Sequence, residues 1–538
     1  MTSGAAENST TLRHEVHQER VVRCHVMRPP HIFAMFAESH ARAPRELAIV
    51  DGGLRLSYDE LDRLVTLCAA RLFSVGVEMG DRVAILLGNR VDFIVTMLAV
   101  ARLGAISVPM NVRQKRPEIG YALTDSGSKV LIHEVALEAE LPDPSDTPGT
   151  TQRIAVDDSN RVWDFSGDAS LAPPPAAPGE DSPFCILYTS GTTGRPKGAV
   201  LTHFSTLTSC LGAEPSLGLR DGERTILTVP ASHVTGTILV LLLMIRVAGS
   251  TVIQANFKAS EFLKAAADER ISYAIMVPSM YSLCLMEPDV EGHDLSAWRI
   301  GAYGGAPMPE SVIERLAAVV PGMSLVNIYG ATETSSPAVM MPAGEGRVRT
   351  ASVGRALPYC DLLIMDEQGR EVAPGDQGEI WLAGPMLFSH YWNNQQATTD
   401  AMVNGYWKSG DIGSVDRAGF LQLHDRKKDM INRGGYKIYS AEVENVLMSH
   451  PAIIEAGVVG YPCPVLGERV AAFVVASGTT SETELRDFCG RQLSDYKVPE
   501  KIFIVTEGLP RNANGKLLKI ELRTRVAAML AGRSAGGN

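Results

Sequence analysis

A glycine-rich segment, Tyr188–Gly198, constrains the fold of this chain more than any other feature. Its sequence is Tyr-Thr-Ser-Gly-Thr-Thr-Gly-Arg-Pro-Lys-Gly, and it directly follows the apolar run Phe184–Leu187. An apolar strand that ends in such a loop presents uncrowded backbone N–H groups, hydroxyl donors and the ammonium of Lys197, which together suit phosphate groups. The loop is not a Walker A motif, because Lys197 is followed by glycine and not by Ser or Thr. A surface turn is the alternative, since Gly, Ser, Thr and Pro are common turn residues.

Helical and strand patterns alternate in the chain before this loop. Apolar residues at helical spacing mark residues 58–72 and 91–103, whereas Arg82–Leu87 and Ala105–Pro109 are short apolar runs typical of buried strands. Such alternation indicates largely parallel sheets with helices on both faces. We therefore predict an α/β fold in which a large N-terminal domain contains parallel sheets with flanking helices.

The length of 538 residues predicts at least two domains. Residues 1–30 are polar and charged, and we expect them to be disordered. Residues 31–425 would form the N-terminal domain, in which a change to short strands with Gly and Pro turns predicts a small β-rich subdomain at about 350–424. We expect a hinge at 426–429 and a smaller mobile α+β C-terminal domain at 430–538. Its expected elements are helices at 440–449 and 481–493 and strands at 454–459, 470–476 and 501–505.

Composition excludes several classes of protein. The net charge of −11 argues against a nucleic-acid-binding surface. The eight cysteines form no CxxC pair and lie near no histidine cluster, which favours buried thiols in a reducing compartment over disulfides or a zinc site. The first 30 residues lack the apolar region of a secretory signal, and the longest apolar run, Ile238–Ile245, is too short to span a membrane. We therefore predict a cytoplasmic protein with neither a nucleic-acid partner nor a membrane span.

An acidic residue closes the motif Asn327–Glu333, in which an apolar strand runs into a glycine turn. A carboxylate at a strand end near phosphates is a suitable ligand for Mg²⁺, which prefers oxygen atoms. Taken alone, Glu333 could equally be a solvated loop acid.

A glycine-rich turn also surrounds Asp411 in the motif Trp407–Gly413. Its carboxylate could accept hydrogen bonds from the diol of a ribose. Asp is also common in hairpin turns, which is the alternative interpretation.

Five basic residues lie close together in the motif Asp425–Lys437, around the pair Gly434-Gly435. In an acidic protein they supply the local positive potential that a polyphosphate ligand needs, although a charged interdomain linker would look the same. The basic residues are Arg426, Lys427, Lys428, Arg433 and Lys437.

A lysine ends the turn motif Pro510–Lys516, just before a helical tail. A single lysine near the end of a chain is usually solvated surface. However, the five motifs in this order and spacing resemble those of the ANL superfamily of adenylate-forming enzymes, which includes acyl- and aryl-CoA synthetases. The resemblance covers about residues 35–525.

The resemblance implies an enzyme that converts a carboxylic acid and Mg·ATP to an acyl-adenylate and pyrophosphate, and then transfers the acyl group to the thiol of coenzyme A. In this family pattern Lys516 bridges the carboxylate and the α-phosphate, while Glu333 and Thr192 hold Mg²⁺. Asp411 and Arg426 bind the ribose. The phosphate loop and the remaining cofactor contacts are assigned to Thr189, Ser190, Gly191, Thr192, Thr193, Gly194, Lys197, Gly305, Ala306, Tyr329, Gly330, Thr332 and Lys437.

The resemblance also implies that the C-terminal domain rotates between the two half-reactions, pivoting at Lys428. This rotation would withdraw Lys516 and bring Gly434-Gly435 to the pantetheine tunnel. A glycine pair suits that position because a thin thiol arm must pass the backbone without meeting a Cβ atom.

His233 matches the position of the gate beside the incoming acid, although Ser232 replaces the large apolar residue that is usual before it. A core or loop histidine is the alternative. The residues expected around the acid are mostly small or apolar, which suits an aromatic, arylpropenoic or medium-chain aliphatic acid. The substrate-binding residues predicted in this way are His233, Thr235, Tyr303, Gly304, Ile328 and Gly330.

An AMP-forming acid:CoA ligase is the leading interpretation. An amino-acid-activating domain is disfavoured because no Asp lies in 230–236 to pair with a substrate ammonium. An inactive nucleotide-binding regulator would be expected to lack Lys516 or Glu333, and both are present. A stand-alone enzyme that loads an acyl group onto a carrier-protein thiol is the alternative, and the sequence leaves open whether the enzyme is a homodimer.

Overall fold

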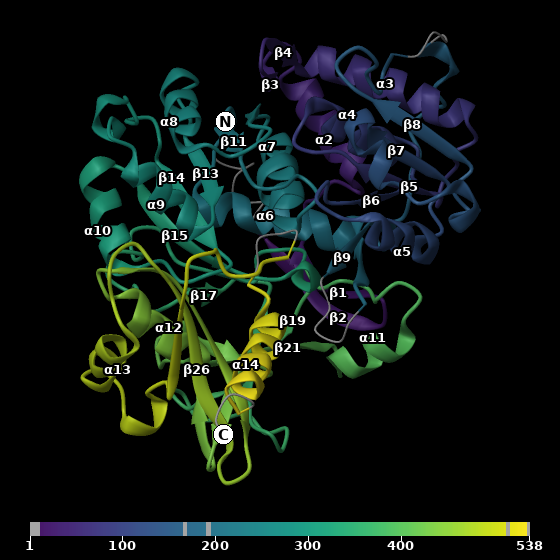
Figure 1. The fold of residues 1–538 in the computed structure, drawn as a ribbon. Coiled ribbons are helices and arrows are strands. Elements are labelled where there is room, and N and C mark those ends of the chain that lie inside the picture. The colour runs from purple at the N-terminus through teal and green to yellow at the C-terminus, as the bar shows by residue number, and fades with distance from the viewer. Residues whose placement is uncertain (1–10, 165–168, 190–194, 513–516, 535–538) are drawn as a thin grey trace. The chain divides into compact units, whose positions relative to one another are not determined.

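The computed structural model describes residues 11–164, 169–189, 195–512 and 517–534 (Figure 1). The chain divides into two compact units. The first comprises residues 1–362 and 382–407, and the second comprises residues 363–381 and 408–538.

A six-stranded sheet in the first unit has the order β10-β9-β6-β5-β7-β8, and only the β9–β10 pair is antiparallel (Figure 1). Its strands are β5 (Arg82–Leu86), β6 (Ile106–Pro109), β7 (Val130–Glu134), β8 (Gln152–Val156), β9 (Pro183–Thr189) and β10 (Lys197–Thr202). The helices beside it are α2 (Ile32–Arg42), α3 (Tyr58–Ser74), α4 (Val91–Arg102) and α5 (Arg116–Ser126). Ser57 starts α3 with a capping box to Glu60. The predicted helices and strands of this region are confirmed.

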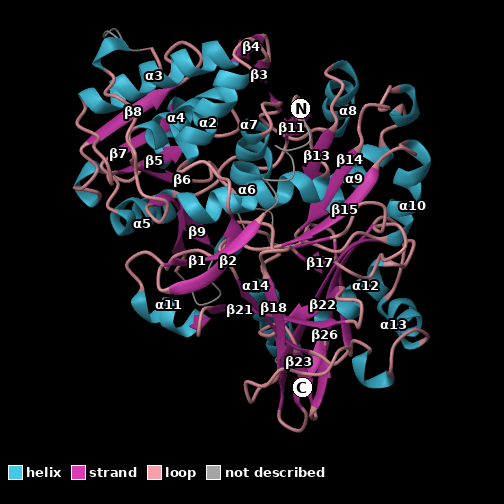
Figure 2. Cartoon of the chain, turned by 180° about the vertical axis from the view of Figure 1, so that it is seen from behind, coloured by secondary structure: helices cyan, strands magenta, loops and turns pink. Residues whose placement is uncertain are grey.

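Two further sheets belong to this unit. The order β11-β12-β3-β4 is formed by β3 (Leu47–Asp51), β4 (Leu54–Ser57), β11 (Arg224–Leu227) and β12 (Ser250–Ile253). The order β13-β14-β15-β16-β17 is formed by β13 (Tyr273–Met276), β14 (Ile300–Gly304), β15 (Ser324–Tyr329), β16 (Val339–Met340) and β17 (Arg355–Ala356). The helices α8 (Ala259–Asp268), α9 (Pro278–Met286) and α10 (Glu310–Val319) lie beside the latter sheet (Figure 2). The predicted α/β class with parallel sheets is confirmed.

The first unit also contains α6 (His203–Leu217) and a second helical stretch, the π-helical segment η4 (Thr235–Leu242) continued by α7 (Leu243–Arg246). The apolar run Ile238–Ile245 lies in η4 and α7 and is buried. Among the described residues, no helix combines the length and the apolar character that crossing a membrane would need.

The unit boundaries fall within three strands of a β-rich region, in agreement with the predicted strand content of 350–424. Its elements are β18 (Asp361–Met365), β19 (Gly378–Ala383), α11 (Gln395–Ala401), β20 (Met402–Val403), β21 (Tyr406–Val415) and β22 (Leu421–Arg426). The sheet order is β18-β19-β21-β20, with β22 paired to β21.

The last block of the chain forms its own sheet, with the order β24-β23-β26-β25 and with β27 paired to β26. The strands are β23 (Ile431–Arg433), β24 (Tyr436–Ile438), β25 (Ile453–Cys463), β26 (Gly467–Ala476) and β27 (Lys501–Val505). The helices are α12 (Ser440–Met448), α13 (Glu482–Gly490) and α14 (Lys519–Ser534). The predicted helices and strands after residue 430 are confirmed.

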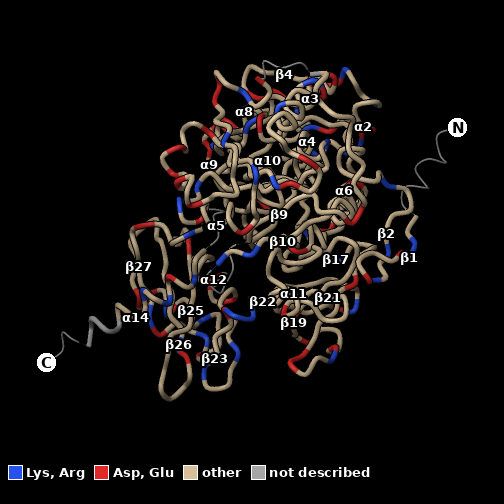
Figure 3. Tube along the Cα trace, turned by 90° about the vertical axis from the view of Figure 1, so that its right-hand side faces the viewer, with Lys and Arg blue, Asp and Glu red and all other residues tan. Residues whose placement is uncertain are grey.

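Charges and thiols are arranged as the composition suggests. Basic and acidic positions are interspersed along the described part of both units (Figure 3). All eight cysteines are buried and none forms a disulfide. Burial raises the pKa of the Cys68 thiol to about 12, so this thiol stays protonated.

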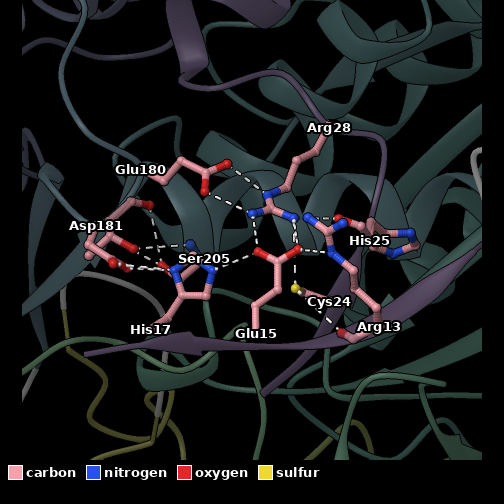
Figure 4. Close-up of polar contacts among 10 residues, drawn as sticks. Arg13, Glu15, His17, Cys24, His25, Arg28, Glu180, Asp181 and Ser205 are labelled. Carbon is pink, nitrogen blue, oxygen red and sulfur yellow. Dashed lines mark hydrogen bonds and ion pairs between the residues drawn. The ribbon is translucent and has the colours of Figure 1, made fainter. Parts of the chain in front are cut away.

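The expectation that residues 1–30 are disordered is wrong for residues 11–30. Strands β1 (Leu12–His17) and β2 (Arg20–His25) form an antiparallel hairpin that packs on α6. The His17 ring stacks on Phe204 at 3.6 Å between ring centroids. Arg28 donates to Glu15 and to Glu180 at 2.7 Å (Figure 4). These partners lie far away in the sequence, which is why local composition did not reveal the hairpin.

Glu15, His17 and Cys24 bring their polar atoms within 4.8 Å of one another, a set that could ligate a metal ion. However, the Arg28 guanidinium lies 3.7 Å from the Cys24 sulfur and is hydrogen-bonded to Glu15. It also holds the pKa of the Glu15 carboxyl down at about 2. A positive charge is therefore already in place, and we interpret the cluster as an ion-pair network that docks the hairpin.

Candidate active site

Both ends of the glycine-rich loop are held by hydrogen bonds. Thr189 faces Lys197 across the β9–β10 pair, and its hydroxyl donates to the Lys197 carbonyl at 3.3 Å. The Tyr188 hydroxyl donates to Asp125 Oδ2 at 2.6 Å, and the Tyr121 hydroxyl donates to the Pro196 carbonyl at 3.0 Å. The predicted phosphate-binding residues Ser190, Gly191, Thr192, Thr193 and Gly194 lie outside the described residues.

Residues 389–392 run beside β10 as it leaves this loop. The Trp392 amide donates to the Gly198 carbonyl at 2.7 Å, and the Ser389 amide donates to the Val200 carbonyl at 2.9 Å. This pairing places Tyr391 opposite Ala199. The loop exit is thus fastened to a segment almost two hundred residues later in the sequence.

Tyr391 joins two of the predicted site residues. Its hydroxyl donates to Glu333 Oε1 at 2.7 Å, and the Lys197 ammonium lies 4.2 Å from the centre of its ring. Burial, reinforced by the Glu333 charge, raises the pKa of the Tyr391 phenol, which therefore remains a donor at neutral pH. A cation over an aromatic ring is attracted to it. Tyr391 was not predicted from the sequence, because only the pairing of 389–392 with β10 brings it here.

Glu333 lies in a single 3-10 turn, Thr332–Thr334, just beyond the carboxyl end of β15. The Phe388 amide donates to the Glu333 carbonyl at 2.8 Å, and the Thr334 hydroxyl accepts from the Ala331 amide at 2.9 Å. Glu333 is half-buried, and its second carboxylate oxygen has no hydrogen-bond partner among the described residues. A fixed carboxylate with one oxygen available fits a hard cation such as Mg²⁺.

The carboxyl ends of β14 and β15 bring two predicted binding segments together. Gly304 pairs with Ile328, and a Cβ atom at Gly304 would lie 2.5 Å from the Ile328 carbonyl oxygen, so only glycine fits. Tyr329 follows directly and is buried, whereas Gly305, Ala306 and Gly330 are exposed. Tyr303 belongs to the hydrophobic core around Trp298, and its role in substrate binding stays a prediction.

His233 lies in a turn before the π-helical segment η4. Its amide donates to the Pro230 carbonyl at 3.0 Å, and its Nδ1 accepts from the Thr235 amide at 3.3 Å. Both His233 and Thr235 are half-buried. Short π-helical segments frequently occur at functional sites. The gate role of His233 stays a prediction.

In the second unit, the two predicted ribose ligands are neighbours. Asp411 and Arg426 face each other across β21 and β22, with Arg426 Nε 3.3 Å from Asp411 Oδ1. Lys437 forms an exposed ion pair with Glu367 at 2.8 Å. The structure thus provides the Asp–Arg pair as a unit, while its contact with a ribose stays a prediction.

The glycine pair has a structural requirement of its own. Gly434 and Gly435 form the tight turn between β23 and β24, with φ of +60° and +90°. Two consecutive positive φ angles are characteristic of the favoured two-residue hairpin turn and suit glycine. The pair is exposed, and a Cβ atom at Gly435 would have no neighbour within 4 Å. The turn alone therefore explains both glycines, and passage of a thiol arm stays a prediction.

The remaining predicted residues are the hinge and the bridging lysine. Lys428 is exposed and lies in the turn that follows β22. Lys516 lies outside the described residues. In the sequence it directly precedes Leu517, which pairs with Arg511 just before the start of α14.

Comparison with protein families matches residues 36–392 to the AMP-binding enzyme family and residues 442–516 to the AMP-binding enzyme C-terminal domain. The chain is 35% identical over 499 residues to a long-chain-fatty-acid–CoA ligase of Mycobacterium tuberculosis, which covers 90% of this chain and 96% of that protein. It is also 35% identical over 489 residues to a feruloyl-CoA synthase of Amycolatopsis, with 90% and 96% covered.

Solved structures agree with these relatives. The o-succinylbenzoate CoA synthetase of Bacillus subtilis, in complex with its acyl-adenylate intermediate, matches with a TM-score of 0.84 at 29% identity over 93% of this chain and 99% of that chain. The same synthetase in complex with ATP and a magnesium ion matches with a TM-score of 0.83 at 30% identity, over 91% of this chain and 98% of that chain. The chain therefore belongs to the AMP-binding enzyme family, in the acyl-CoA synthetase branch of the ANL superfamily of adenylate-forming enzymes, and its cofactors are ATP, Mg²⁺ and coenzyme A.

Proposed function

We propose that this enzyme activates a hydrophobic carboxylic acid with Mg·ATP to an acyl-adenylate and then transfers the acyl group to coenzyme A. The observation that carries the proposal is the trio Lys197, Tyr391 and Glu333. It places a cation from the phosphate loop and a carboxylate for Mg²⁺ on one aromatic side chain.

The first half-reaction joins two anions, because a carboxylate oxygen attacks the α-phosphorus while pyrophosphate leaves. Positive charge must therefore be fixed where negative charge concentrates. Lys197 would neutralise the β- and γ-phosphates from the loop exit, and Glu333 would hold Mg²⁺, which supplies further positive charge to the phosphates. By the family pattern, Lys516 would bridge the carboxylate and the α-phosphate, and Asp411 with Arg426 would orient the ribose.

The second half-reaction needs a different geometry, since the thiol of coenzyme A must reach the acyl carbon and AMP must leave. A pivot at Lys428 would remove Lys516 and present the exposed Gly434-Gly435 turn to the pantetheine arm. One site could then serve two reactions in succession.

The substrate class rests on the residues expected around the acid, which are small or apolar apart from a few hydroxyl groups. Two of the named relatives are a long-chain-fatty-acid–CoA ligase and a feruloyl-CoA synthase, whose acids are hydrophobic monocarboxylates, whereas the third takes o-succinylbenzoate, an aromatic dicarboxylate. We therefore favour an aromatic, arylpropenoic or medium-chain aliphatic monocarboxylate. The residues that would contact the acid are His233, Thr235, Gly304, Ile328 and Gly330.

The test is a pyrophosphate-release screen over benzoate, ferulate, octanoate, palmitate, 2-succinylbenzoate and malonate, each with and without coenzyme A. The proposal expects release with at least one hydrophobic monocarboxylate and an acyl-CoA product by chromatography. Glu333→Gln serves as the inactive control on the same panel. Release that depends on an acid but never yields a CoA thioester would favour loading of a carrier-protein thiol. Release only with the dicarboxylates would overturn the substrate class.

A further inference from the structure

We propose that Arg523 is a positioning residue that ties helix α14 to the hinge and so orients the Lys516 segment for adenylate formation. This inference rests on the proposed function. It concerns a side chain to which neither the sequence motifs nor the comparisons assign a role.

Arg523 makes two contacts with the hinge. Its Nη2 atom donates to the Lys428 carbonyl at 3.1 Å and forms an ion pair with Asp429 Oδ1 at 2.9 Å. The Asp429 side chain is only 10% exposed, so water competes weakly for this pair. The guanidinium therefore holds the backbone carbonyl of the expected pivot, Lys428, and the side chain of the next residue, Asp429.

The face of α14 next to Arg523 is fixed by apolar packing. Leu522 and Val526 are fully buried in a hydrophobic cluster with Tyr461 and Phe473. Since Leu522 directly precedes Arg523, the helix delivers the guanidinium to the hinge with little freedom. The contact is thus a tie between two fixed elements and not a mobile surface pair.

A second tie holds the first turn of α14. Lys519 Nζ lies 2.7 Å from Glu444 Oε1 and 2.6 Å from the Ser440 hydroxyl, which both belong to α12. Burial raises the pKa of the Glu444 carboxyl, although the Lys519 charge opposes this shift. These two ties anchor the start of α14, and Lys516 precedes Lys519 by three positions in the sequence.

Residues before Lys428 are bonded to β21, whereas the Lys428 carbonyl and the residue after it are bonded to α14. Before the change, Arg426 pairs with Asp411 and the Lys427 amide donates to the Gly410 carbonyl at 2.8 Å, which anchors both residues to β21. After it, the Lys428 carbonyl and Asp429 are bonded to α14. A rotation about the Lys428 N–Cα bond would keep each set intact. Arg523 would therefore keep Asp429 and α14, the helix that follows Lys516, moving as one body during the rotation.

Some hydrogen bonds cross this point and would have to break. The Asp425 carboxylate accepts from the Ser440 hydroxyl at 2.7 Å, and the Asp429 and Met430 amides both donate to the Arg426 carbonyl. The two amides report directly on the order of the hinge. Their hydrogen exchange can be measured in the free full-length chain without any substrate.

The chain offers a matched control on the same helix. Arg525 lies two positions after Arg523, is exposed, and makes no hydrogen bond or ion pair with the described part of the chain. Arg523→Ala should lower acyl-adenylate formation about tenfold at saturating ATP, while thioester formation from a supplied acyl-adenylate changes less than about twofold. Arg525→Ala should leave both rates unchanged. Arg523→Lys should recover most of the loss, because it keeps the charge and donors.

The exchange experiment separates this inference from the proposed function. The Asp429 and Met430 amides should exchange faster in Arg523→Ala than in Arg525→Ala or wild type, even if no acid yields pyrophosphate. Unchanged exchange would overturn the tie itself. Faster exchange with an equal loss in both half-reactions, or with no loss in either, would overturn the positioning role. If Arg523→Ala does not fold, Asp429→Asn removes the charge of the partner and should produce the same selective defect at smaller size.

Discussion

The two units hold their predicted site residues in different ways. In the first unit, Lys197 begins the buried strand β10, Glu333 follows the buried strand β15, and the two are joined through the buried side chain of Tyr391. In the second, the ion pairs at the hinge differ in exposure, since the lysine of Lys427–Glu379 is 53% exposed whereas Asp429, the partner of Arg523, is 10% exposed. Burial fixes geometry, whereas exposed ion pairs are weak and exchange readily. This difference is in line with the proposal that Lys516 is repositioned between the two half-reactions.

The predicted site glycines of the two units also differ in why glycine is required. Gly304 is required by a neighbouring backbone that leaves no room for a side chain, and it lies at the end of a buried strand. A Cβ atom at Gly434 would meet only the Leu466 side chain, at 3.4 Å, and one at Gly435 would meet nothing within 4 Å, so both glycines are required only by their positive φ angles in an exposed turn. Substitution should therefore disturb packing in the first unit and local turn geometry in the second.

The largest effect should come from Lys516→Ala. Removing its charge should slow adenylate formation by roughly 10²- to 10³-fold, as is typical for loss of a group that stabilises developing charge. Thioester formation from a supplied acyl-adenylate should be nearly unchanged, because the lysine is needed only in the first step. Single-turnover measurements of both half-reactions test this. Equal losses would contradict the proposal that Lys516 acts only in the first half-reaction.

Lys428→Pro should affect the opposite half-reaction. Proline fixes its own φ and restricts the preceding residue, so the pivot would be locked at the point where the hinge changes partners. We expect thioester formation to fall by roughly 10²-fold while adenylation is retained. The same two assays measure it, with Lys427→Ala as the control for loss of a hinge lysine. A normal thioester rate would exclude the pivot at this residue.

Tyr391→Phe should have a smaller effect within the fixed unit. It removes the hydroxyl that donates to Glu333 but keeps the ring beneath Lys197. Losing one hydrogen bond to a charged group should reduce adenylation about tenfold and raise the Mg²⁺ concentration that half-saturates it. Pyrophosphate release titrated with Mg²⁺ measures both. Tyr436→Phe, at an exposed tyrosine of the second unit, is the control, and an unchanged Mg²⁺ requirement in Tyr391→Phe would show that the phenol does not orient Glu333.

The smallest effect concerns stability and belongs to the buried core of the first unit. His203 is fully buried and burial lowers the pKa of its imidazole to about 3, below the 6.5 of an exposed histidine. The unfolded chain therefore binds a proton between pH 6.5 and 3 that the folded chain does not, and stability falls as pH decreases through this range. From pH 7.5 to 5 the loss should be about 2 kcal/mol.

The predicted loss of stability at low pH can be tested by measuring the urea unfolding midpoints of wild type and His203→Asn at pH 7.5 and 5.0. The wild type should lose more stability than the variant on acidification, because asparagine does not titrate. Parallel losses would mean that other groups dominate and that His203 is not held neutral by burial.

The sequence allowed prediction of those features that depend on local pattern. Apolar spacing placed α3, α4, α12 and α13 within a few residues, and the parallel sheets followed from the alternation of elements. The motif order led to the family, which the matches to 36–392 and 442–516 confirm. Asp411 and Arg426 were expected to act together, and the structure makes them cross-strand neighbours.

Features that depend on distant partners could not be predicted in this way. Tyr391 reaches Glu333 across 58 positions, and the N-terminal hairpin is held by Phe204, Glu180 and Asp181. Neither contact leaves a periodic or compositional signal at its own position. For the same reason the contact of Arg523 with Asp429, 94 positions away, could not be predicted from the sequence of the helical tail.

The docked hairpin has a practical consequence for anyone who trims this protein for expression. A version that starts at residue 31 would bare the ring of Phe204 and strip Glu180 of its guanidinium partner and Asp181 of its imidazole. Those acids stand at the entrance to β9, the strand that leads into the glycine-rich loop. Shortening the front of the polypeptide would thus loosen the approach to the nucleotide site, more than a hundred and fifty residues downstream.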